Sequence, residues 1–402
     1  MLIGNFSPWP SFTLEESEAV QDVLLSNKVN YWTGDECRKF ESEFAAFTGC
    51  AHAIAVSNGT VALDLCLRAL CISDGDEVIV TSRTFLASVS SIVNAGAIPV
   101  FADVDLNSQN ITAHTIQNVI SPRTRAILCV HLAGWPCDMD PILSLAQDHD
   151  LVVIEDCAQA HGAMYKGRSV GSIGDVASWS FCQDKIITTG GEGGMVTTNS
   201  SNLWSKMWSF KDHGKSWEAM YEKEHPPGFR WVHESFGTNW RMTEMQAAIG
   251  RIQLKRINKW HKVRLSNARR IWEAASQCER IRVPNFSCDE CEGACSELNQ
   301  CSHAAYKCYI FVNGSESDRD AIMDIINGKG IPCFSGSCSE VYLEKAFEGT
   351  DLRPQKPLLN AKLLGQTSLM FLCHPTLTTA EVDRMCVAIK EATSEYWNRG
   401  TP

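Results

Sequence analysis

The fold class can be read from residues 151–198, which run LVVIEDCAQAHGAMYKGRSVGSIGDVASWSFCQDKIITTGGEGGMVTT. Three short apolar runs in this stretch have the length of buried strands. They are Leu151–Glu155, Ala177–Phe181 and Met195–Thr198. Asp156 follows the first run directly and Lys185 follows the second after a few residues. The pattern predicts strands of one sheet, with polar side chains gathered where the strands end.

Apolar runs of the same kind recur upstream, and helical patterns lie between them. The upstream runs are Ala53–Val56, Glu77–Thr81, Ile98–Ala102 and Ala126–Leu132, and the helical patterns lie near 60–71, 84–95 and 139–149. Alternation of helices with nearly continuous apolar strands is typical of a parallel sheet covered on both faces. We therefore predict an α/β fold whose large domain holds a mostly parallel seven-stranded sheet between helices.

The segments on either side of this core extend the prediction. Thr13 and Glu16 form a capping box that predicts an N-terminal helix. The pattern weakens from about 200 to 242, a stretch rich in Trp, His and charge that we interpret as a long functional loop. A further helix is expected at about 243–258.

A smaller α+β unit is expected at the C-terminus. Its predicted elements are a strand at Tyr306–Val312, a helix at Asp318–Asn327 closed by Gly328, and a last helix from about Thr379. We place the domain boundary near residue 255. The prediction is a large domain over 1–255, with the N-terminal helix, and a small domain over 256–402.

Composition excludes several classes of function. The 402 residues are 44% hydrophobic and carry a net charge of −11, without a basic cluster that could follow a phosphate backbone, which argues against nucleic-acid binding. No apolar run of about 18 residues is present, so no membrane span is expected. The first residues lack a secretory signal pattern, so we interpret the eighteen cysteines as reduced thiols of a cytoplasmic protein.

Four short motifs carry chemistry-bearing residues, although each has an ordinary structural explanation. Gly59 and Thr60 open a helix after a strand, where free N–H groups attract an anion, but any strand-to-helix turn can look like this. Asp156 could pair with a protonated heterocyclic nitrogen or cap the next turn. Lys185 could be an amine nucleophile or a solvated loop residue. Phe85 could stack on a planar ligand or belong to the core.

Together these motifs describe a single site. An anion cradle, an aromatic plate, an acid and an amine suit pyridoxal 5′-phosphate held as a Schiff base. The glycine pairs near 190 do not form G-x-G-x-x-G, so a dinucleotide-binding motif is not indicated.

The chain resembles the DegT/DnrJ/EryC1/StrS family of sugar aminotransferases. The resemblance runs from about residue 5 to 395 through SNGTVALDLCLRAL, TFLAS, FADVD, VHLAGWPCDM, EDCAQAHGA, TTGGEGGM, TNWRMTEMQAAIGRIQL and LCHPTLT. It implies a fold-type I pyridoxal-phosphate enzyme that acts on nucleotide-linked keto sugars. By the resemblance, Lys185 is the Schiff-base lysine, Asp156 pairs with the pyridine nitrogen, and Gln159 contacts the ring hydroxyl. Phe85 stacks on the ring, Gly59, Thr60 and Ser180 bind the phosphate, and Asn239 reaches the phosphate of the neighbouring subunit.

The resemblance implies a homodimeric aminotransferase with shared active sites. It would move an amino group from glutamate to C4 or C3 of a nucleotide-activated deoxysugar, for surface polysaccharide or glycoside biosynthesis. An alternative is a sugar dehydratase of the same fold, which the lysine at position 185 argues against, since such members carry histidine there. Another alternative is a non-catalytic cofactor-binding regulator, which would not need Lys185, Asp156 and Gln159 all intact.

Three stretches depart from or extend the family pattern. The segment between Lys211 and Trp240 is longer than the loop that the resemblance implies. Its Lys215 and Arg230 are either candidates for binding a substrate pyrophosphate or solvated surface charges. Cysteines crowd one run, at Cys288, Cys291, Cys295 and Cys301. Their spacing fits a zinc knuckle poorly, so we expect no metal and an irregular insertion. The segment GIPCFSGSCSEVYLE, residues 330–344, is expected to border the sugar pocket.

Overall fold

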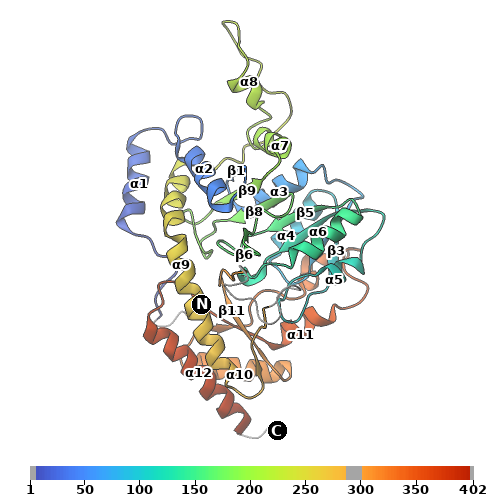
Figure 1. The fold of residues 1–402 in the computed structure, drawn as a ribbon, viewed down its shortest axis with the longest axis vertical. Coiled ribbons are helices and arrows are strands. Elements are labelled where there is room, and N and C mark those ends of the chain that lie inside the picture. The colour runs from blue at the N-terminus through green and yellow to red at the C-terminus, as the bar shows by residue number, and fades with distance from the viewer. Residues whose placement is uncertain (1–5, 287–300, 399–402) are drawn as a thin grey trace.

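The computed structural model describes residues 6–286 and 301–398, and a seven-stranded sheet forms the centre of the large domain (Figure 1). The strands are β1 (His52–Val56), β2 (Glu77–Thr81), β3 (Ile98–Ala102), β4 (Thr124–Val130), β5 (Val152–Asp156), β8 (Val176–Ser180) and β9 (Gly194–Thr198). Their order is β1-β9-β8-β5-β4-β2-β3. Strand β9 is antiparallel to both neighbours, and the other pairs are parallel. The predicted sheet is confirmed, with some strand ends displaced by one or two residues.

Helices cover both faces of this sheet. They include α2 (Glu36–Thr48), α3 (Gly59–Ala69), α4 (Ala87–Asn94), α5 (Ala113–Gln117) and α6 (Met139–Asp148). Successive side chains of β2 serve opposite faces, as a strand requires. Val78 and Val80 pack into the cluster beneath α3 and α4, whereas Ile79 joins the cluster beneath α5 and α6.

The large and small domains are connected through the helix α9 (Glu244–Ser276), which is twice as long as the predicted 243–258. The polar residues Arg264 and Asn267 occupy inward positions of α9 and interrupt the apolar pattern, which is why the sequence prediction stopped early. Helix α9 packs against α1 (Leu14–Leu25) and α2, and also against α12 (Thr379–Asn398). The boundary near 255 falls inside this helix, and the division into 1–255 and 256–402 stays a prediction. The capping box that starts α1 is confirmed, since the Thr13 N–H donates to Glu16 over 2.9 Å.

The C-terminal part forms a second sheet with helices against it. Its strands are β10 (Ile281–Arg282), β11 (Cys308–Val312), β12 (Cys333–Phe334) and β13 (Ser368–Phe371), in the antiparallel order β10-β11-β13-β12. The helices α10 (Glu316–Gly328) and α11 (Leu359–Thr367) accompany α12. Strand β11 begins two residues later than predicted, so Tyr306 and Lys307 lie in the segment before it and face the large domain. Gly328 is the last residue of α10, and the glycine with a positive φ, +73°, is Gly330 just beyond the helix.

The stretch from 200 to 242 is not one long loop, so that part of the prediction is wrong. It begins with α7 (Ser201–Lys211), whose Met207 and Trp208 are buried against the large domain. The sequence obscured this helix because its inward face also carries Lys211, a fully buried cation. The following residues 214–238, which we call the arm, contain α8 (Trp217–Tyr221) and project from the body of the molecule (Figure 1).

The cysteines of the described residues form no disulfide, and most of them are buried. Of the cysteine-rich run, Cys288, Cys291 and Cys295 lie outside the described residues. Cys301 is buried, and its sulfur accepts a hydrogen bond from the Lys166 N–H at 3.3 Å. In the described part of the chain, no helix combines the length and the apolar character that crossing a membrane would require.

Candidate active site

A cavity of about 910 Å³ lies where strands of the large sheet end and meet the small domain. Its large-domain wall comes from residues that follow β1, β2, β5 and β8, as expected of a mostly parallel sheet. The small-domain wall comes from Tyr306 to Tyr309 and from Gly336 to Val341, so the segment 330–344 borders the cavity as expected. The cavity brings together seven of the eight predicted site residues, namely Gly59, Thr60, Phe85, Asp156, Gln159, Ser180 and Lys185.

One end of the cavity has the form of an anion cradle. Helix α3 starts there at Gly59, and the Asn58 side chain caps it by accepting the Val61 N–H at 2.9 Å. A Cβ atom on Gly59 would lie 2.6 Å from the Ser180 Cβ atom, so only glycine lets α3 approach β8 this closely. The Thr60 and Ser180 hydroxyls and the first N–H groups of α3 therefore surround a small space suited to a phosphate.

This close approach predicts the effect of a Gly59→Ala substitution. The added methyl group would push α3 away from β8 and spread the cradle, so we expect the dissociation constant of a phosphate-bearing cofactor to rise about tenfold or more. Equilibrium dialysis of the cofactor measures this change. Gly328→Ala is the matched control, because no atom outside its own helix lies within 4 Å of its added Cβ. Unchanged retention in Gly59→Ala would contradict the cradle.

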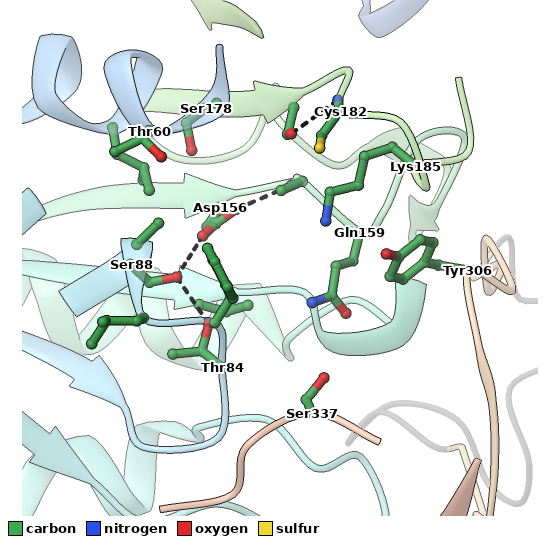
Figure 2. A pocket seen from close by; sticks show the side chains of 18 of the residues that line it. Thr60, Thr84, Ser88, Asp156, Gln159, Ser178, Cys182, Lys185, Tyr306 and Ser337 are labelled. Carbon is green, nitrogen blue, oxygen red and sulfur yellow. Dashed lines mark hydrogen bonds between the residues drawn. The ribbon is translucent and has the colours of Figure 1, made fainter. Parts of the chain in front are cut away.

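At the centre of the cavity, Asp156 presents a buried carboxylate. Its Oδ2 accepts a hydrogen bond from the Ser88 hydroxyl at 2.8 Å, and its Oδ1 accepts the Ala158 N–H at 3.1 Å (Figure 2). Ser88 in turn shares a 2.9 Å hydrogen bond with Thr84. Among the described residues no cationic side chain forms an ion pair with Asp156. A buried carboxylate with this surrounding is suited to a cationic ring nitrogen in the cavity.

The neighbouring acid, Glu155, has a different role because successive strand residues face opposite ways. His131 Nε2 lies 3.0 Å from its carboxylate, and the N–H groups of Gly171, Ile173 and Gly174 donate to it over 2.7–2.8 Å. Burial alone would raise the pKa of Glu155, but these hydrogen bonds and His131 hold it below its usual value. Glu155 therefore stabilises the loop before β8 and does not line the cavity.

Lys185 extends its amine into the cavity from the loop after β8 (Figure 2). Its backbone is fixed from outside, because the Trp9 indole N–H donates to the Lys185 carbonyl over 2.8 Å. Its Nζ atom lies 5.0 Å from the centre of the Tyr306 ring, which makes a cation–π contact. The lysine is thus held by the N-terminal segment on one side and by the small domain on the other.

Gln159 and Phe85 lie around the space between Lys185 and Asp156. The Gln159 Oε1 atom accepts the Ala133 N–H at 2.8 Å, so the amide is anchored and its NH₂ group is left for the cavity (Figure 2). Phe85 lines the cavity and is 71% exposed, whereas phenylalanine side chains are usually buried. It is therefore not a core residue, and its ring is available to a planar ligand.

Tyr306 and Asp184 belong to the site although the sequence analysis did not identify them. The Tyr306 hydroxyl donates to the Asp184 carboxylate. Burial raises the pKa of Asp184, but Lys185 and Tyr306 outweigh it and keep the pKa below its ordinary value. Asp184 precedes the lysine in the sequence, so it could have been suspected. Tyr306 is 121 residues away from Lys185 by number, and only the folded chain brings the two together.

Three predicted ligand residues lie outside the cavity. Asn239 is exposed and pairs with Asp212 in a short antiparallel bridge at the base of the arm. Lys215 is 3.2 Å from Asp212 and covers the Trp32 ring, and Arg230 is exposed on the arm. Within one chain none of these side chains lines the cavity.

Comparison with known proteins finds similar aminotransferases both by sequence and by structure. A model of the DegT/DnrJ/EryC1/StrS aminotransferase family matches residues 10–390. The crystal structure of an aminotransferase from Psychrobacter cryohalolentis is similar with a TM-score of 0.93 and 58% identity, over 98% of this chain and 100% of that one.

Two curated proteins illustrate the similarity in sequence. GDP-perosamine synthase of Escherichia coli O157:H7 is 45% identical over 253 residues. The match covers 62% of this chain and 65% of that protein, which is less than two thirds of the relative's length. The dTDP-3-amino-3,4,6-trideoxy-alpha-D-glucose transaminase of Streptomyces venezuelae is 32% identical over 377 residues, covering 94% of this chain and 92% of that protein.

Proposed function

Since the chain belongs to the DegT/DnrJ/EryC1/StrS aminotransferase family, we propose that it is a pyridoxal-phosphate-dependent aminotransferase acting on a nucleotide-linked keto sugar. The amino donor is glutamate, and the acceptor is a deoxysugar with its keto group at C4 or C3. The observation that carries the proposal is the single cavity that holds Lys185, Asp156 and the cradle of Gly59 and Ser180. The names of the relatives above support a nucleotide-linked sugar as acceptor.

The residues present fit pyridoxal phosphate at each of its polar groups. The cradle at Gly59, which a Cβ would fill, suits the phosphate, and the buried Asp156 carboxylate suits a protonated pyridine nitrogen. The free NH₂ group of Gln159 suits the ring hydroxyl, and Phe85 offers a face for stacking. When bound, this cofactor supplies an electron sink and carries the amino group between the two half-reactions.

The side chains that line the cavity then have defined roles in the proposed reaction. Asp156, oriented by Ser88, would keep a proton on the pyridine nitrogen of the bound cofactor, because a buried carboxylate stabilises an adjacent positive charge. With the cofactor bound, Lys185 Nζ would accept the proton from the α-carbon of the donor and donate it to the C4′ carbon of the cofactor, acting first as general base and then as general acid. The side chains of the small-domain wall exclude water from this space and contact the sugar.

The active enzyme is proposed to be a homodimer in the cytoplasm, with Asn239 reaching the cofactor phosphate of the partner. The position of Asn239 outside its own cavity supports this assignment. So do the bulky apolar side chains that the arm exposes, Phe229, Trp231 and Phe236, because exposed aromatic side chains of this size are typical of an interface.

The visible absorbance of the cofactor-loaded protein tests the proposal. On addition of glutamate, we expect the absorbance of the aldehyde form of the cofactor to disappear as the aminated form accumulates, with one 2-oxoglutarate released per site. A panel of nucleotide-linked keto sugars should then restore the original spectrum, and the sugar that does so identifies the acceptor. A spectrum indifferent to glutamate and to other amino donors would support the non-catalytic regulator instead.

A further inference from the structure

Lys307 is a second amine in the cavity, and the functions described above do not use it. It lies just before β11, on the small-domain wall, and is partly buried. Its Nζ atom is 4.7 Å from the centre of the Tyr306 ring, the ring that also lies 5.0 Å from Lys185 Nζ. The two amines therefore lie around one aromatic side chain, and one comes from each domain.

The charges around Tyr306 are not balanced. Lys185, Lys307 and Arg264 all interact electrostatically with a single carboxylate, Asp184, which already accepts the Tyr306 hydroxyl. Arg264 is fully buried, and two of its guanidinium nitrogens have no hydrogen-bond partner in the described chain. Burial lowers the pKa of Lys307, and the neighbouring cations Arg264 and Lys185 lower it further against the opposing effect of Asp184. This corner of the cavity would accommodate another negative charge.

Few side chains that line the cavity can bind an anion outside the phosphate cradle. The charged side chains among the described residues that line it are Asp156, Asp184, Lys185, Glu192, Lys307 and Glu344. Four of these are acidic, and Lys185 is occupied in the proposed reaction. In the part of the chain that the structure describes, no carboxylate lies within ion-pair distance of Lys307, and Asp184 acts on it only from further away. It is the cation left for a substrate.

We propose that Lys307 binds the α-carboxylate of the amino donor. The inference rests on the proposed function, because it requires an amino acid to react beside Lys185. In an amino acid the amine and the carboxylate share one carbon, so the carboxylate must lie close to the reacting amine. In a nucleotide-linked sugar the diphosphate is separated from the keto carbon by the sugar ring. A cation that shares an aromatic ring with Lys185 is thus better placed for the carboxylate than for the diphosphate.

The test compares Lys307→Met with wild type in binding and in each half-reaction. The binding probe is 2-methylglutamate, which carries a methyl group in place of the α-hydrogen and cannot transaminate, and its dissociation constant is measured by calorimetry on cofactor-loaded protein. We expect Lys307→Met to raise this constant about 10- to 100-fold, since the variant removes a hydrogen bond between charged groups. The glutamate concentration for half-saturation should rise similarly, whereas that for the keto sugar should stay within twofold of wild type.

Two further variants separate recognition from folding. Lys307→Arg keeps the charge and should recover most of the binding, and Lys307→Gln serves if Lys307→Met does not fold. Lys362→Met, an exposed lysine on α11 of the small domain, is the control that should leave every value unchanged.

The possible outcomes are distinct. Wild-type affinity of Lys307→Met for 2-methylglutamate, or a loss confined to the keto sugar, would overturn the assignment of Lys307. A wild-type protein that binds the analogue but transfers no amino group to any sugar would instead overturn the proposed function, because the binding measurement does not depend on turnover.

Discussion

Replacing Lys185 by alanine is expected to abolish transamination and leave a folded protein. The amine is proposed both to anchor the cofactor and to move the proton, and a positioned general base alone contributes about 10²- to 10⁴-fold. We therefore expect kcat to fall by at least about 10³-fold. Among the described residues the ammonium group would lose its contact with the Tyr306 ring at 5.0 Å, worth about 0.5–1 kcal/mol, and its electrostatic interaction with Asp184, so the fold should persist.

Single-turnover kinetics with glutamate measure this loss, and the visible spectrum reports the lost link between protein and cofactor. Lys255→Ala, an exposed lysine on α9, is the control and should behave as wild type. Lys307 lies on the same ring as Lys185 but comes from the other domain, so we expect it not to substitute. Full turnover by Lys185→Ala would refute the assignment of the site.

The sheet could be predicted because its strands are short and continuously apolar. Strand β2 is buried along its whole length, and such strands stand out against the polar turns between them. Helix α7 was not predicted, and α9 was predicted too short, because buried cations occupy the inward faces of both helices. Lys211 lies between Glu41 and the Tyr31 ring, and Arg264 lies over the Trp9 ring. A periodicity argument counts such residues as exposed, although tertiary contacts accommodate them.

The site could be predicted to the extent that its residues follow strand ends. Asp156 is the last residue of β5, and Lys185 lies in the loop that follows β8, so local sequence located them. Tyr306 and Lys307 come from the small domain, and no local pattern links them to a lysine more than a hundred residues earlier. Ser88 lies within a predicted helix, and its hydroxyl is functional only because α4 begins beside Asp156.

Two inactive variants are expected to restore activity when their chains are mixed, if the active site is shared between protomers. In Asn239→Asp, a carboxylate would replace the amide that is proposed to reach the partner's phosphate, and its repulsion should prevent cofactor binding. In Lys185→Ala the reacting amine is missing. A two-fold dimer of one chain of each kind holds one site with both lesions and one with neither.

Random exchange of equal amounts of the two chains makes half of the dimers mixed, so about a quarter of wild-type activity should return. Mixing Lys185→Ala with Asp156→Ala is the matched control, because both residues line the cavity of their own chain and every mixed site keeps one lesion. Mass spectrometry of the intact dimers shows whether exchange has taken place. Mixed dimers of the first pair without activity would exclude a contribution of Asn239 across the interface. Activity in the control pair would show instead that mixing restores activity by correcting the assembly of the chains. Recovery in the first pair would then be no evidence of a shared site.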